Sequence, residues 1–336
     1  MDSADRPGAF VISLDFELLW GMRDHAEGHG VVADDLVTSR AHVRRTADLF
    51  AARGIRATWA TVGLLFAHSA GELEPFLPTV RPRYTRSELD PYGEAVGEDE
   101  ESDPLRLAGS LVEHLAATAG QEVASHTFSH YYCLESGQDE EALRADLAAA
   151  RAIAEPLGIP LTSLVLPRNQ WNPRYAQAVL DSGFTCYRGP QPSWGHHAQK
   201  AETTSRARRA ARLADTYGGL APPPTFGWDD VVEESGLCNI PASAFLRPYS
   251  PQRRALEPLR RTRLVAGLRA AARRGRLFHL WWHPHNFARH PDESFDLLNT
   301  VLDEADRLAA SDGLASMSMG DVARLARSGA AGPGRP

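Results

Sequence analysis

The stretch FVISLDFELLWG (residues 10–21) begins with apolar, β-branched residues and continues into two acidic side chains. The apolar run predicts a buried strand over residues 10–15. Because side chains of a strand alternate between its two faces, a strand that stays extended through Phe16 points Asp15 and Glu17 to the same side. Carboxylates here are costly unless they are solvated, paired or bound to a metal. The stretch therefore predicts a sheet strand that ends in a candidate active site.

Short apolar runs alternate with longer segments of helical period along the whole chain. This alternation is typical of a parallel sheet with crossover helices. Helices are expected over residues 40–53, over residues 139–157 with Asp139 as the N-cap, and from Asn172 and Pro173 onward. We therefore expect the α/β class, as a distorted β/α barrel of seven or eight strands. The predicted strands are residues 10–15, 56–62, 122–125, 163–166, 184–187, 237–240, 277–282 and 314–317.

The length of 336 residues suits one large domain, which we expect over residues 9–327. The polar residues 1–8 and the Gly/Pro-rich residues 328–336 are predicted to be disordered tails. Two long segments, residues 68–104 and 189–228, interrupt the alternation of strands and helices. Loops of this length are usually functional or disordered, and their aromatic residues favour a substrate rim.

The composition, 43% apolar and 24% charged, is typical of a soluble globular protein. A formal net charge of -7 argues against a general nucleic-acid binder, and the basic run at residues 206–212 has the spacing of an amphipathic helix with a solvated face. No apolar run approaches the roughly 20 residues of a membrane span or forms a signal peptide, so we expect a cytoplasmic protein. Cys133, Cys186 and Cys238 are expected to be reduced and buried.

Polar side chains suited to metal binding or proton transfer follow several predicted strands. In parallel barrels this edge holds the active site. In SHTFSH (residues 125–130), His126 and His130 stand four apart, which would place both imidazoles on one side of a helical turn. A carboxylate from another strand end would complete a His-His-carboxylate metal set, although ordinary core or surface histidines are the alternative. The strand-end residues are Asp15, Glu17, His126, His130, Pro167, Arg168, His283 and His285.

These motifs resemble those of the polysaccharide deacetylase family (NodB homology, carbohydrate esterase family 4 in its enzyme members). That family has an acidic TFDDG motif, a strand like ATFFVVG, an HSxxH metal motif, an RxPxG-like segment and a late LxxH. Here the similar pieces occur in the same order over residues 10–325. They are SLDFE (13–17), ATWATVG (57–63), SHTFSH (125–130), LPRN (166–169) and LWWH (280–283).

The resemblance implies that Asp15 is the general base and that His126 and His130 bind the metal. The second acid of the family normally follows the first directly, yet Phe16 stands there. Side-chain direction therefore gives the carboxylate ligand to Glu17, and an exchange of roles between Asp15 and Glu17 stays open.

The arginine of the fourth segment is also displaced. In the family it usually stands two residues before the proline, where this chain has Val165. Arg168 follows Pro167 instead. If its guanidinium reaches Asp15, it would keep the base ionised and oriented, whereas an ordinary surface ion pair is the alternative.

The resemblance also implies that His283 is the general acid. His285 and Asn286 are nearby alternatives for this role and candidate substrate contacts. A buried strand-end histidine bonded to backbone is the structural alternative for His283. Flat apolar side chains suit sugar rings, so three tryptophans are candidate walls of the pocket, although each is more often part of a core: Trp20, Trp281 and Trp282.

Together these features imply a metal-dependent hydrolase that removes an N-acyl group, most plausibly N-acetyl, from a small intracellular amino sugar or sugar conjugate. One divalent ion is expected, zinc by default, with cobalt or nickel able to substitute. One alternative is a hydrolase of the same fold acting on a non-sugar C–N bond, such as a cyclic amide, a ureide or a natural-product intermediate. Another is a non-catalytic, metal-retaining binding protein. A homo-oligomer is compatible with the sequence.

Overall fold

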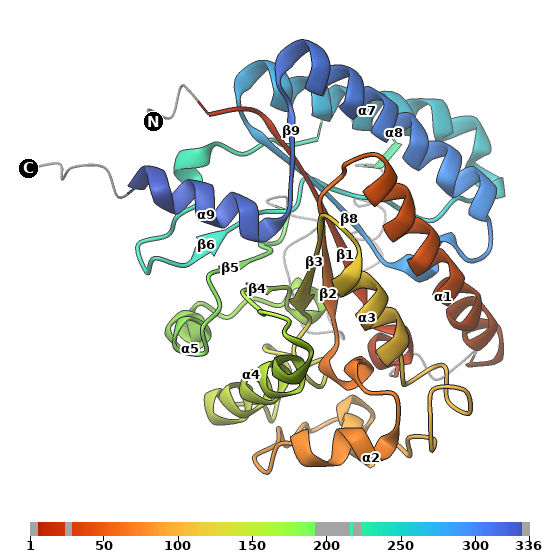
Figure 1. The fold of residues 1–336 in the computed structure, drawn as a ribbon, viewed down its shortest axis with the longest axis vertical. Helices are drawn as coiled ribbons and strands as arrows, with labels where there is room; N and C mark the ends of the chain where they lie inside the picture. The colour runs from red at the N-terminus through yellow and green to blue at the C-terminus, as the bar shows by residue number, and fades with distance from the viewer. Residues whose placement is uncertain (1–5, 24–28, 192–215, 218–222, 331–336) are drawn as a thin grey trace, which may run out of the picture.

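A single sheet of parallel strands forms the centre of the molecule (Figure 1). The computed structural model describes residues 6–23, 29–191, 216–217 and 223–330. All eight predicted strands are present within it, and the sheet order is β6-β5-β4-β3-β2-β1-β8-β7, with β9 beside the start of β1. The strands are β1 Ala9–Phe16, β2 Ala57–Thr61, β3 Gln121–Ser125, β4 Ser163–Leu164, β5 Cys186–Tyr187, β6 Cys238–Asn239, β7 Ala244–Phe245, β8 Leu277–Trp282 and β9 Ala315–Met317.

The segment between β6 and β7 connects the two ends of the sheet. The backbone N–H of Ala242 donates to the carbonyl of Gly189, just after β5, at 3.0 Å. The next N–H, that of Ser243, donates to the carbonyl of His279 in β8 at 2.8 Å. The sheet therefore curls into a distorted β/α barrel, which confirms the predicted fold class.

Helices surround this sheet, and α9 lies apart from α1, α7 and α8 in Figure 1. Asp139 caps α4 and Asn172 caps the 3-10 turn before α5, as predicted, whereas α1 begins well before residue 40. The expected basic helix at residues 206–212 lies outside the described residues. No helix in the described part of the chain could span a membrane. The helices are α1 His29–Ala52, α2 Ala70–Leu73, α3 Gly109–Ala117, α4 Glu140–Ala154, α5 Ala176–Asp181, α7 Glu257–Arg274, α8 Pro291–Asp312 and α9 Met319–Ala330.

Alternation along β1 separates two apolar cores. Ile12 and Leu14 belong to the large core that also contains the buried faces of α1, α3, α4, α7 and α8. Val11, on the other face of β1, packs in a smaller core with Met319 and Val322 of α9. Helix α9 therefore covers the barrel interior near the amino ends of the strands.

The same alternation fills the other end of the interior with polar groups. Ser13 and Asp15 follow Val11 on the inward face of β1 and are 0% and 3% exposed. Burying such groups is costly unless they are hydrogen-bonded or paired. The carboxyl ends of the strands are therefore where the fold concentrates its polar chemistry.

The long segment at residues 68–104 is ordered and lies beside this edge. It contains α2 and short 3-10 turns, and its Arg83 N–H donates to the carbonyl of Gly137 at 2.7 Å. Much of the segment at residues 189–228 lies outside the described residues. Both predicted tails are shorter at their inner ends than expected. Arg6 is buried against Trp228, and α9 continues to Ala330. All three cysteines are buried and unpaired.

Candidate active site

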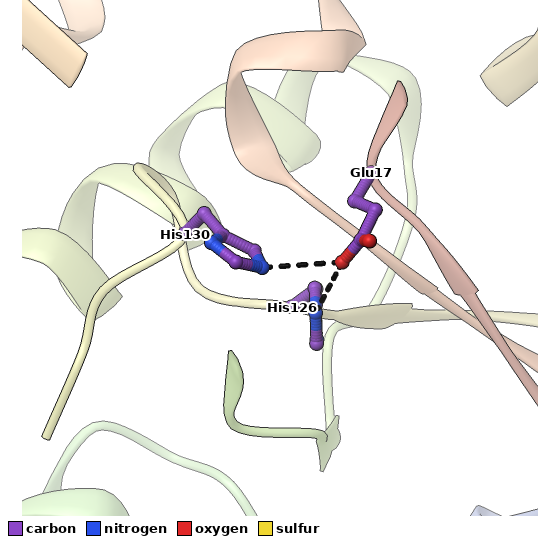
Figure 2. A group of neighbouring side chains, drawn as sticks. All are labelled: Glu17, His126 and His130. Carbon is purple, nitrogen blue, oxygen red and sulfur yellow. Dashed lines mark hydrogen bonds and ion pairs between the residues drawn. The ribbon is translucent and has the colours of Figure 1, made fainter. Parts of the chain in front are cut away.

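Three buried side chains from two strand ends converge on one point (Figure 2). The Oε2 atom of Glu17 lies 3.1 Å from Nε2 of His130 and 3.3 Å from Nε2 of His126. The ligand-type atoms of the three residues all lie within 4.8 Å of one another. A carboxylate and two imidazoles are a donor set typical of zinc and related divalent ions. This group could therefore hold a metal ion.

The hydrogen bonding of His126 fits a metal ligand. Its Nδ1 lies 2.8 Å from the carbonyl oxygen of Val165, which can only accept, so Nδ1 carries the proton. In the neutral imidazole the lone pair is then on Nε2, and this atom has no hydrogen-bond partner among the described residues. A hydrogen bond from the other ring nitrogen, here Nδ1, is what fixes the orientation of metal-binding histidines in proteins. Burial also lowers the pKa of His130 to about 3, so its imidazole is neutral and has a lone pair that could bind a metal ion.

The expected helical turn between the two histidines is wrong. Residues 126–130 form a loop in which Thr127 and His130 have φ of 63° and 59°. The Ser125 hydroxyl accepts from the N–H of Thr127 at 3.0 Å, and the Thr127 hydroxyl accepts from that of Tyr131 at 2.7 Å. These local bonds replace helical ones, so the two imidazoles meet through left-handed backbone conformations.

A buried carboxylate of α4 holds this loop. Asp146 accepts from the N–H of Phe128 at 2.6 Å and from the N–H of Ser129 at 3.1 Å. It also accepts from the Ser129 hydroxyl. Burial raises its pKa to about 6 against the lowering effect of these bonds. Two of the three residues between the metal-site histidines, Phe128 and Ser129, are thus fastened to a helix of the scaffold.

We expect Asp146→Asn to weaken metal binding about tenfold, because one side-chain NH₂ would face the loop's N–H donors and displace the histidines. Chelator competition with Zn²⁺ measures this. Asp139→Asn is the matched control, since Asp139 caps the same helix and asparagine caps equally well. Equal zinc affinity in Asp146→Asn and wild type would show that the loop needs no such anchor.

Glu17 depends on the glycine that ends the motif SLDFELLWG. A Cβ atom at Gly21 would lie 2.0 Å from Cδ of Glu17, closer than any real contact. We expect Gly21→Ala to push the carboxylate away and to weaken zinc binding at least tenfold. Gly93→Ala is the control, because a Cβ there meets no atom within 4 Å. Similar zinc affinities for the two variants would contradict this.

A guanidinium holds the second carboxylate of the motif. Arg188 donates from Nη1 to Oδ1 of Asp15 at 2.6 Å and from Nη2 to Oδ2 at 2.7 Å. Burial alone would raise the pKa of Asp15, but the charge and the hydrogen bonds of Arg188 outweigh it and lower the pKa below its ordinary value. Asp15 is therefore an ionised, oriented carboxylate beside the metal group.

The contact expected of Arg168 is thus made by Arg188, which is a correction. Arg168 lies with its guanidinium carbon 4.5 Å from the ring centre of Tyr132 and its Nη1 3.8 Å from the carboxylate of Glu135. The physical reason is the curvature of the sheet. In a barrel, the end of β5 faces the end of β1 across the interior, although other strands separate them in the sheet order.

His283 completes the group from the end of β8. Its Nε2 lies 3.5 Å from Oε1 of Glu17 and 3.8 Å from Oδ2 of Asp15. The side chain is 22% exposed, so it faces both the carboxylates and the solvent. The ring of His285 stacks on it at 4.9 Å, and burial lowers the pKa of His285 to about 4. A partly exposed imidazole beside the metal group is positioned to exchange a proton with a bound molecule.

Other predicted contacts lie elsewhere. Trp20 and Trp282 are 1% and 0% exposed and belong to the large core, so their assignment to the pocket wall is wrong. Of the three candidate tryptophans, Trp281 is the partly exposed one, with its ring 5.6 Å from that of His283. Asn286 accepts from the backbone N–H of His283 at 3.3 Å, so its oxygen supports the histidine.

Backbone strain gathers at this edge. Every non-glycine residue with positive φ in the described chain follows β1, β3 or β4 at its carboxyl end. Such conformations cost about 1–3 kcal/mol each and tend to occur at functional sites. Their clustering marks the same edge as the metal group and the buried ion pair. The residues are Leu18, Thr127, His130, Arg168 and Asn169.

Sequence reasoning missed Arg188 and Asp146. Arg188 directly follows a predicted strand, the criterion that selected the other site residues, so it could have been found. Asp146 lies within the predicted helix, where an acidic residue normally faces solvent, and no sequence signal distinguishes it.

Comparisons with known proteins agree with the fold. Neither a protein-family model nor a curated protein matches the sequence. Among solved structures, a candidate polysaccharide deacetylase from Mycobacterium smegmatis has a TM-score of 0.61 at 14% identity, covering 99% of this chain and 96% of that chain. A candidate polysaccharide deacetylase from Pseudomonas aeruginosa PAO1 gives 0.56 at 15%, with 97% and 92% covered. Puue allantoinase gives 0.54 at 14%, also with 97% and 92% covered. The chain thus has the fold of these proteins.

Proposed function

We propose that the chain is a metal-dependent hydrolase that cleaves an N-acyl bond, an N-acetyl group on an amino sugar or sugar conjugate. The observation that carries the proposal is the convergence of Glu17, His126 and His130 with Asp15 and His283 at one strand edge. A carboxylate base, an imidazole acid and a metal-ligand set are the parts that hydrolysis of an amide needs.

A divalent ion, zinc by default, would be held by Glu17, His126 and His130 and would supply Lewis acidity for water and for the acyl oxygen. Asp15 is the base that takes a proton from the attacking water, since its carboxylate is ionised and fixed by Arg188. His283 gives a proton to the amide nitrogen as the C–N bond breaks. The products are a carboxylic acid and an amine, and the water has been consumed.

The substrate we propose is small and intracellular. The support for the small size is the position of residues 68–104, which pack along the loop that follows the metal-site histidines. Tyr84 of this segment accepts from the N–H of Tyr132 at 2.8 Å, and Leu89 accepts from Arg23 at 3.0 Å. In this proposal the segment fastened beside the site restricts access to it, which favours a short substrate over a polymer.

The test is an assay of zinc-loaded protein against short N-acetyl amino sugars, nucleotide sugars, chitin and peptidoglycan, measuring release of acetate and amine. Asp15→Asn protein, loaded in the same way, is the control for contaminating activity. The proposal expects release from short substrates alone. Efficient release from polymer, or recovery of the native protein from culture medium, counts against the substrate assignment.

The similarity to an allantoinase supports a second candidate, hydrolysis of a cyclic amide or ureide by the same residues. Adding cyclic ureides to the panel separates the two. Ring opening without acetate release would favour this candidate.

A further inference from the structure

Behind the Asp15–Arg188 pair lies a chain of buried hydrogen bonds that the proposed reaction does not use directly. We propose that Ser13 and His279 are positioning residues, which fix the Arg188 guanidinium and through it the orientation of the Asp15 carboxylate. This inference rests on the proposed function, in which Asp15 is the base. The side-chain bonds described for the two residues join them to each other, to Arg188 and to the backbone of Ile240, and none goes to the metal group.

The guanidinium of Arg188 is held on all sides. Besides its two bonds to Asp15, Nη1 donates to the Ser13 hydroxyl at 3.0 Å and Nε donates to Oδ1 of Asn169 at 3.0 Å. Its central carbon lies 4.2 Å from the ring centre of Trp281. The side chain is 0% exposed, so no solvent replaces a lost contact. Its rotation is set by the protein alone.

The protons of this chain can be arranged in only one direction. Nδ1 of His279 lies 3.1 Å from the carbonyl of Ile240, which only accepts, so Nδ1 carries the proton. Nε2 must then accept from the Ser13 hydroxyl, 2.8 Å away. The Ser13 oxygen in turn accepts from Arg188. Burial, with help from Arg188, lowers the pKa of His279 to about 3, which keeps the imidazole neutral as this order requires.

In this arrangement of protons, the role of the buried His279 is to fix the direction of the Ser13 hydroxyl. Because the Ser13 hydroxyl donates its proton to the imidazole, its oxygen keeps a lone pair that accepts from Nη1 of Arg188. Without the hydroxyl, the second N–H of Nη1 would lose its acceptor, and the guanidinium would be held less tightly by its bonds to Asp15 and Asn169. Asp15 would turn with it, and small displacements of a catalytic group cost up to about a hundredfold in rate.

The primary test is Ser13→Ala, assayed as zinc-loaded protein. We expect kcat to fall about tenfold to a hundredfold, with KM and zinc content unchanged. Ser39→Ala is the matched control. It removes a buried hydroxyl that donates to the carbonyl of Leu36 within α1, and it should leave kcat unchanged. An unchanged kcat in Ser13→Ala, an equal fall in both variants, or a fall that follows zinc loss would overturn the proposal.

Replacement of His279 tests the direction of the chain. The amide oxygen of glutamine can take the place of Nε2 and accept from Ser13, whereas alanine cannot. We expect His279→Gln to retain more kcat than His279→Ala. Should His279→Ala fail to fold, His279→Gln still decides, because a kcat below that of Ser13→Ala contradicts the assigned direction.

A crystal structure of Ser13→Ala gives a readout independent of turnover. We expect the Arg188 and Asp15 side chains to rotate or to adopt more than one conformation, with Glu17, His126 and His130 unmoved. If wild type acts on no compound of the panel, the proposed function fails, but this comparison still tests the positioning. Arg188 and Asp15 unmoved in the variant would refute it.

Discussion

Alanine at His126 or at His130 is expected to abolish zinc binding and to lower turnover by more than about a thousandfold, a large part of the ~10⁶-fold or greater acceleration typical of enzymes. Each substitution removes one of three ligands and leaves the buried Glu17 carboxylate with fewer partners. Elemental analysis after mild dialysis and the acetate-release assay measure both effects.

The control for these variants is His114→Ala. His114 lies on α3 and bonds the carboxylate of Asp48 at 3.0 Å, away from the strand edge that carries the metal group. Zinc content and kcat should stay at the wild-type level. Full zinc content in both site variants would exclude Glu17, His126 and His130 as the metal site.

The fold was predictable because its strands are short apolar runs between clear helices. The one strand of the described chain that was missed, β7 Ala244–Phe245, follows β6 after four residues, with no helix between the two. A strand of two residues is too short to show a recognisable alternation of side chains. It is made a strand by its bonds to β8, where Leu246 N–H donates to the carbonyl of Trp281 at 2.8 Å. Those bonds depend on closure of the barrel.

The grouping of Glu17 with His126 and His130 was predictable because strand ends of a parallel barrel meet at one edge. The reason given for the histidine spacing was wrong, since a strained loop and not a helical turn joins them. Five residues are too few to distinguish the two by pattern. The outcome is the same because both geometries bring positions four apart together.

Alternation also decides which tryptophan faces the site. His279, Trp281 and His283 share one face of β8 and its extension, and Trp282 faces the core. The sequence contains this information once His283 is placed in the site. The contact of Arg188 with Asp15 is harder to predict. The two residues are 173 positions apart, and only the curved sheet brings them together.

The largest separation of roles is expected between Asp15→Asn and Glu17→Gln. Asparagine keeps the shape of the base but cannot take a proton, so Asp15→Asn should lower kcat by about 10³-fold or more while zinc stays bound. It also leaves Arg188 without its buried counter-charge, so thermal unfolding is measured beside turnover. Asp103→Asn is the matched control, a buried aspartate with Arg106 as its partner outside the site.

Glu17→Gln should give the opposite result. A neutral amide is a weaker metal ligand than a carboxylate, so zinc content after dialysis should fall first and turnover should fall with it. Excess zinc in the assay should then restore part of the activity of Glu17→Gln and none of that of Asp15→Asn. Asp15 near the end of β1 and Glu17 just after it both lie within 4 Å of His283, so position alone leaves their roles interchangeable. What distinguishes them is the partner each one has, the two imidazoles for Glu17 and the guanidinium for Asp15. If zinc is lost from Asp15→Asn and kept by Glu17→Gln, the roles are exchanged. Asp15 would then be the metal ligand and Glu17 the base.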